Sequence, residues 1–177
     1  MSPTALFGVQ FTFSLLLSAL VGGWYVAPAL RKLPVHAALV PLFLLQSLRY
    51  LPATAFAPGQ VGDAVPGGAM AAIAYGDLAS ASLAVGAAVF LHHRLRGAIA
   101  VAWAVNVLTS LDWLQGSLVA ATSRLPTYPL GVNWYIASCY VPAIGVAHVL
   151  IFARLWRGSR ARLTSPGSAA PARASTA

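Results

Sequence analysis

The chain has 177 residues, of which 59% are hydrophobic and 8% are charged, and its net charge is +8. A soluble domain of this size carries about 25% charged residues, so a chain with so few could not cover its surface in water. Composition therefore excludes an ordinary soluble domain, and the single cysteine excludes an intrachain disulfide.

A transmembrane helix needs about 20 apolar residues to cross the ~30 Å hydrocarbon layer of a bilayer. The first stretch of this length covers about residues 6–30 and ends at Arg31-Lys32. No Lys or Arg precedes it, and it is longer than the core of a signal peptide, so we expect a retained helix. The second stretch, about residues 35–54, leads into a loop rich in glycine and proline that holds Asp63.

Three further stretches reach the same length, at about residues 69–91, 97–122 and 131–155. A basic segment that begins at His92 separates the first two of them, and a short segment with two prolines and Arg124 separates the last two. The sequence therefore predicts an all-α polytopic membrane protein, a bundle of five transmembrane helices.

The charges between these stretches predict the orientation of the chain. Basic clusters follow the first, third and fifth stretches, whereas the opposite side holds little charge beyond Arg124 and Asp63. Because cytoplasmic loops are rich in Lys and Arg, we expect the N-terminus outside and the C-terminus in the cytoplasm. The same distribution argues against a nucleic-acid partner and makes membrane lipids the expected partners of the basic residues.

We expect residues 1–157 to form the five-helix transmembrane domain and residues 158–177 to form a disordered, basic cytoplasmic tail. The tail consists of small and polar residues with arginines and holds almost no large apolar side chain. Such a segment cannot bury enough surface to order itself. No internal repeat is visible in the chain, which disfavours an inverted-repeat transporter that acts as a monomer and leaves a homo-oligomer open.

Three charged residues lie deep in the predicted helices, where a lone charge costs at least about 2.5–3.5 kcal/mol. By the 1.5 Å rise per residue, Asp77 and Asp112 lie roughly 12 and 15 Å from the outer ends of their helices, and Arg49 lies in the same outer half. We expect the three side chains to meet inside the bundle. One arginine cannot neutralise two aspartates, so either one aspartate is protonated or another donor or ion completes the cluster.

Helical spacing relates other polar residues to this cluster. Gln46, Arg49 and Tyr50 share a face at i, i+3 and i+4 of a regular helix. Asn106 is turned about 120° from Asp112 and is expected to face a different neighbour. Gly76 is assigned only to close packing between helices.

The fifth helix contributes Tyr140 and His148, which lie on roughly the same face, and Pro142, which is expected to bend the helix. His148 is a candidate proton carrier, haem or metal ligand, or hydrogen-bonded interior residue. No pair of histidines has the i, i+4 spacing of a helix-borne metal site, so we expect no metal ion and no haem. The candidate ligand-binding or proton-carrying residues are Arg49, Asp77, Asp112, Tyr50, Tyr75, Asn106, Tyr140 and His148.

The chain resembles a group of small, uncharacterised five-span membrane proteins of bacteria. The resemblance rests on Leu48-Arg49-Tyr50, on Ala74-Tyr75-Gly76-Asp77-Leu78, on Asn106 with Asp112, and on Tyr140-Val141-Pro142 followed by His148. In that group a histidine stands three residues before the arginine, where this chain has Gln46. The resemblance implies the fold, a multi-pass protein of the inner membrane and this choice of residues, but no established activity. Sterol-isomerase-like and sigma-2-receptor-like proteins are a looser analogy without a matching motif.

Three functions remain open at this stage. The leading one is binding or transport of a small or lipophilic molecule in a cavity lined by the second to fifth helices, where the planar fork of Arg49 anchors an anionic or carbonyl group. The second is a membrane enzyme that acts on a lipid or isoprenoid, with an aspartate or His148 as general acid or base. The third is a structural subunit of a membrane complex, in which the polar cluster only sets helix packing.

Overall fold

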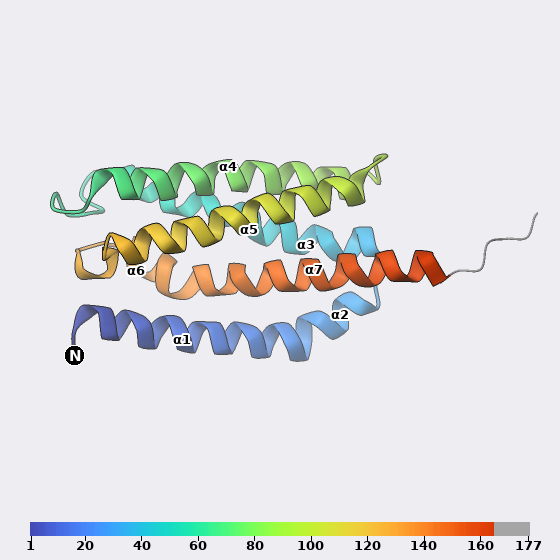
Figure 1. Ribbon diagram of the computed structural model, residues 1–177, viewed down its shortest axis with the longest axis horizontal. Helices are drawn as coiled ribbons and strands as arrows, with labels where there is room; N and C mark the ends of the chain where they lie inside the picture. Colours follow the sequence, from blue (N-terminus) through green and yellow to red (C-terminus); the bar gives the residue numbers. More distant parts are fainter. Residues whose placement is uncertain (165–177) are drawn as a thin grey trace, which may run out of the picture.

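The computed structural model describes residues 1–164, and the regular structure in this range is entirely helical (Figure 1). The long segments are α1 (Pro3–Val21), α3 (Val35–Ser47), α4 (Gly67–His92), α5 (Ala98–Thr122) and α7 (Val141–Thr164). The short segments are α2 (Ala27–Arg31), α6 (Asn133–Tyr135), the π-helical turns η1 (Gly22–Val26) and η4 (Ile136–Tyr140), and the 3₁₀ turns η2 (Leu48–Phe56) and η3 (Leu125–Thr127).

Five helical units in the described part of the chain are long and apolar enough to cross a membrane. They cover Pro3–Arg31, Val35–Phe56, Gly67–His92, Ala98–Thr122 and Asn133–Ser159. The predicted all-α class and the predicted number of such helices are confirmed. Helix α7 continues to Thr164, so the predicted tail begins inside a helix, and the remainder of that tail, residues 165–177, lies outside the described residues.

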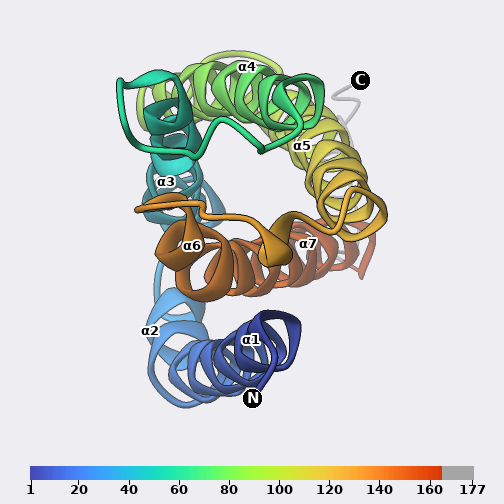
Figure 2. The ribbon, with the colours of Figure 1, turned by 90° about the vertical axis from the view of Figure 1, so that its left-hand side faces the viewer.

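Four of the helices form a ring and the first helix lies outside it. Helices α3, α4, α5 and α7 pack in that order around a centre, with α7 returning to α3 (Figure 2). Helix α1 packs against α7 and η4 on the outer side of the ring. Because α1 has one packed side, no residue in Pro3–Val21 is buried.

Two π-helical turns let the first and last spans accommodate proline. The amide of Ala27 bonds to the carbonyl of Gly22 before Pro28, and the amide of Val141 bonds to the carbonyl of Ile136 before Pro142. Proline has no N–H to donate to the carbonyl four residues earlier, and a π turn moves the neighbouring bond to the carbonyl five residues back. The sequence predicted a bend at Pro142, and the structure has a local π turn just before this proline.

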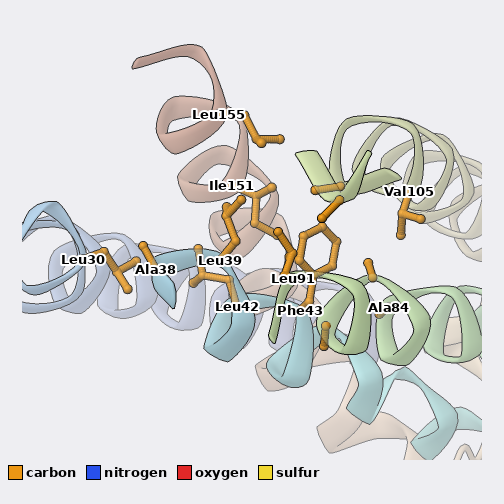
Figure 3. Packing of buried hydrophobic residues seen from close by; sticks show 14 residues of the cluster. Leu30, Ala38, Leu39, Leu42, Phe43, Ala84, Leu91, Val105, Ile151 and Leu155 are labelled. Carbon is orange, nitrogen blue, oxygen red and sulfur yellow. The ribbon is translucent and has the colours of Figure 1, made fainter. Parts of the chain in front are cut away.

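The two ends of the bundle are closed differently. At the end where residues 92–98 join α4 to α5, Leu39, Phe43, Leu91 and Ile151 form an apolar core with neighbouring side chains from α2, α3, α4, α5 and α7 (Figure 3). We call the other end, where the N-terminus lies, the capped end. Two segments cover it, residues 57–66 and 123–132.

The cap is held by a close approach of these two segments. The amide of Gly62 donates to the carbonyl of Pro129 at 3.0 Å. Gly131 has a φ of +54°, and a Cβ there would lie 2.0 Å from the carbonyl oxygen of Gln60. Glycine is therefore needed at position 131 both for its backbone conformation and for the space.

Candidate functional site

The predicted meeting of three charged side chains is confirmed. The Nε of Arg49 donates to Oδ1 of Asp77 at 2.7 Å, and Nη2 of Arg49 lies 2.6 Å from the same oxygen. Nη2 also donates to Oδ2 of Asp112 at 2.5 Å. Nη1 donates to the backbone carbonyl of Thr109 at 2.8 Å. All three nitrogens of the guanidinium group are thus engaged, and α4 and α5 are joined to η2 through one buried side chain.

The two aspartates keep unused hydrogen-bond acceptor capacity, whereas each nitrogen of the arginine already donates a hydrogen bond. Ser80 Oγ donates to Oδ2 of Asp112 at 2.8 Å, so the protein bonds of Asp112 fall on one oxygen. Those of Asp77 fall on Oδ1. Arg49 is 3% exposed, whereas the side chains of Asp77 and Asp112 are 13% and 28% exposed. Each carboxylate therefore retains one oxygen without a hydrogen bond from residues 1–164.

Gly76 has a more specific role than the helix packing assigned to it from the sequence. A Cβ at position 76 would lie 2.3 Å from Oδ1 and 3.3 Å from Cγ of Asp112. The Asp112 carboxylate thus occupies the space that a side chain on α4 would fill. A glycine directly before Asp77 is what allows both carboxylates to reach the same arginine.

A second polar cluster lies one turn further from the capped end and consists of Gln46, Asn106, Thr109 and His148. Nδ1 of His148 lies 3.0 Å from Nε2 of Gln46 and 2.9 Å from Oδ1 of Asn106. Thr109 Oγ1 donates to Oε1 of Gln46 at 3.2 Å. All four residues are buried, and the carbonyl and hydroxyl of Thr109 connect this cluster to Arg49.

This second cluster contains two of the candidate residues from the sequence, Asn106 and His148. Asn106 faces a different neighbour from Asp112, as its angular position predicted. His148 is a buried residue whose ring is hydrogen-bonded to the amide groups of Gln46 and Asn106 and lies beside the ring of Trp113, while its Nε2 atom has no hydrogen-bond partner among residues 1–164. The described residues contain no group of three or more His, Cys, Asp or Glu that could hold a metal ion.

The prediction that Gln46, Arg49 and Tyr50 share one helix face is wrong for Tyr50. Helix α3 ends at Ser47, and the 3₁₀ turn η2 begins at Leu48. A 3₁₀ turn has three residues per turn, so residues i and i+3 eclipse each other. Gln46 and Arg49 are consequently both buried, whereas Tyr50 is turned outward and is 51% exposed.

Two other tyrosines predicted for the site make no hydrogen bond to the charged cluster. Tyr75 is 63% exposed, and its ring contacts that of Phe56 at a centroid distance of 5.2 Å. Tyr140 donates its hydroxyl to the backbone carbonyl of Leu45 at 2.7 Å and so ties η4 to α3. Neither residue lines the cavity described below.

A cavity of about 730 Å³ extends from the charged cluster toward the capped end. Arg49, Asp77 and Asp112 line its inner end, and Arg124 lies at its outer end. Its remaining wall is mostly apolar and comes from α1, α4, α5 and the α6–α7 segment. Ligand pockets measure about 300–1,000 Å³ and combine an apolar wall with a few polar groups, and this cavity has both properties.

The sequence interpretation missed several contributors to this site. α1 was assigned no part in the cavity, yet Phe7, Phe11 and neighbouring residues line it. Ser80 and Thr109 were not among the residues predicted for the site, and their contacts with Asp112 and Arg49 depend on helix register. For Ser80 the sequence did carry a signal, because this polar residue and Asp77 lie three residues apart, on one face of an apolar helix.

The comparisons with known proteins give a family but no activity. A search of curated proteins and a search of solved structures return no match to the chain. A family model described as a domain of unknown function, DUF8737, matches residues 6–156. This range includes three of the long apolar helices in full, most of the first and the last, and every residue of both polar clusters. This match covers most of the chain, and the protein therefore belongs to the DUF8737 family.

Proposed function

We propose that this protein is an integral membrane protein that binds a small lipophilic molecule in the cavity at the capped end. The observation that carries the proposal is the form of the cavity, which has a mostly apolar wall and a single charged cluster at its inner end. Maintaining charges at such depth is costly, and a purely structural ion pair does not require an adjoining cavity of about 730 Å³.

Several features favour binding over the other functions considered. The apolar core fills the end of the bundle opposite the cavity, so passage of a molecule through the protein would require that core to separate. His148 does not line the cavity, which removes support for its use as a general base on a bound molecule. The anchoring role first given to Arg49 is also disfavoured, because its three nitrogens already donate to protein oxygens.

The cavity wall offers a position at which binding can be blocked without touching the charged residues. Gly116 lines the cavity, and a Cβ there would meet only Ile73, at 3.9 Å. We expect Gly116→Leu to fill part of the cavity and to lower the occupancy of a 1-dodecanol probe at least about tenfold, since the added atoms exclude the probe. Native mass spectrometry of protein released from nanodiscs measures this occupancy.

The matched control is Leu118→Phe, on the same helix at a side chain that is 64% exposed. This variant enlarges the surface away from the cavity and should bind the probe as the parent protein does. Equal binding of the probe by the parent protein and by Gly116→Leu would contradict the proposed function.

We also propose that the chain inserts with the capped end outside and the C-terminus in the cytoplasm. The basic residues at the end of α2, directly after α4 and in the C-terminal part of α7 belong to the end opposite the cap (Figure 1), which agrees with the positive-inside rule. In a Cys139→Ser background, a membrane-impermeant maleimide added to intact cells should label Ser123→Cys and not His93→Cys. Labelling of His93→Cys and not of Ser123→Cys would show that the chain has the opposite orientation.

A further inference from the structure

If the cavity binds a lipophilic molecule, as proposed above, the charged cluster determines which polar head that molecule carries. We infer that the head is a protonated amine, bound by the carboxylates of Asp77 and Asp112 at the inner end of the cavity. This inference rests on the proposed function and goes beyond it by naming the chemical class of the ligand.

The charge of the cluster is the first reason. Arg49 contributes one positive charge and the two aspartates contribute two negative charges, which leaves one negative charge when all three groups are ionised. An uncompensated charge inside a membrane costs several kcal/mol in hydrocarbon, and a cation beside it offsets this cost. A neutral or anionic head would leave the charge unbalanced or add to it.

The distribution of hydrogen-bond donors and acceptors is the second reason. All three guanidinium nitrogens of Arg49 are occupied, and the group is 3% exposed, so it offers little to an anionic ligand. Asp77 Oδ2 and Asp112 Oδ1 have no hydrogen bond from residues 1–164, and both residues line the cavity. A primary ammonium group has three N–H donors and no acceptor, which matches two free carboxylate oxygens.

The remaining charge in the cavity does not alter this balance. Helix α5 ends at Thr122, ten residues beyond Asp112, and Arg124 lies two residues further along the chain. Its backbone is therefore roughly 15 Å or more from that of Asp112 along the helix axis. It is exposed, and solvent and salt screen such a charge over this distance. The acidic and basic ends of the cavity are therefore electrostatically separate.

An unpartnered amide in the wall independently indicates that the cavity takes a ligand with polar atoms. Asn133 lines the cavity and is 5% exposed. Its Oδ1 accepts a hydrogen bond from Thr54 at 3.3 Å, but its Nδ2 is buried without a partner among residues 1–164. A buried donor without a partner costs about 1–3 kcal/mol, which an oxygen on the bound molecule would offset.

The test compares three probes that share one chain and differ only in the head group. Dodecylamine, 1-dodecanol and dodecanoate are titrated into protein in phosphatidylcholine nanodiscs, with affinities expressed per mole fraction of probe in the bilayer and read by native mass spectrometry. We expect dodecylamine to bind at least about tenfold more tightly than 1-dodecanol, and dodecanoate to bind most weakly, because only the ammonium compensates the buried negative charge.

Two variants assign the effect to the carboxylate. Asp112→Asn removes the excess charge and should lower the affinity for dodecylamine at least about tenfold, while binding of 1-dodecanol persists and shows that the cavity is intact. Asp63→Asn, in the loop between η2 and α4 and outside the cavity, is the matched control and should leave the affinity for dodecylamine unchanged.

The outcomes distinguish failure of the amine assignment from failure of the proposed function. Binding of none of the three probes overturns the proposed function. Equal affinities for amine and alcohol, or an amine affinity that Asp112→Asn does not change, overturn the amine assignment and leave the cavity as a lipophile site. In nanodiscs that contain phosphatidylethanolamine, competition with dodecylamine identifies a lipid amine head as the source, and absence of competition identifies a free lipophilic amine.

Discussion

Replacing Arg49 by methionine is expected to lower the free energy of unfolding by about 3 kcal/mol, because it leaves two partly buried carboxylates without their cation. The loss is not only one of charge, since the guanidinium also bonds to the Thr109 carbonyl. Reversible unfolding by dodecyl sulfate in mixed micelles measures the change.

The control for this variant is Arg124→Met, which removes an exposed arginine and is expected to change stability by less than about 0.5 kcal/mol. The triple variant Arg49→Met with Asp77→Asn and Asp112→Asn removes the whole charged cluster. It should recover most of the loss, since replacing all members of a buried ion pair by uncharged residues is often neutral or stabilising. If Arg49→Met alone is as stable as the parent protein, the three side chains do not form the buried cluster described above.

The second large effect is expected at Gly76. Gly76→Ala places a methyl group 2.3 Å from the present position of Asp112 Oδ1, so the carboxylate must move. Movement disrupts the bonds of Asp112 to Arg49 and Ser80, which are charge-assisted, and we expect a loss of about 1.5–3 kcal/mol in the same unfolding measurement.

Gly86→Ala is the matched control because it lies on the same helix and a Cβ there meets no heavy atom within 4 Å. This control is expected to be neutral or to stabilise by up to about 1 kcal/mol, as alanine favours helix over glycine. In an Asp112→Ala background the penalty of Gly76→Ala should disappear. A penalty that persists there would show that the glycine is needed for helix packing and not for the carboxylate.

A larger part of the fold than of the site could be predicted from the sequence. Five apolar stretches of about 20 residues need no tertiary information, because the length and composition of a helix decide whether it can cross a bilayer. The meeting of Arg49, Asp77 and Asp112 was predictable for a related reason. Few partners exist for a charge in an apolar bundle, and three charges at similar depth have little choice but one another.

The sequence was not sufficient to predict which way individual side chains point, because this depends on local backbone geometry and on helix packing. Regular helical spacing placed Tyr50 beside Arg49, whereas the 3₁₀ turn η2 rotates it outward. The sequence carries a weak signal in Pro52, which cannot donate an intrahelical hydrogen bond, but the turn begins at Leu48, before that residue. The exposure of Tyr75 likewise reflects which side of α4 meets its neighbours.

By itself, the sequence determined that the protein is helical and apolar, which of its residues are costly to bury and that three of these would meet. Only the tertiary structure decided that α1 stands outside the ring, that the Asp112 carboxylate fills the space left by Gly76, and that a cavity adjoins the cluster. The physical reason is that hydropathy and charge are properties of single residues, whereas a cavity depends on the relative register of several helices, which small differences in packing determine.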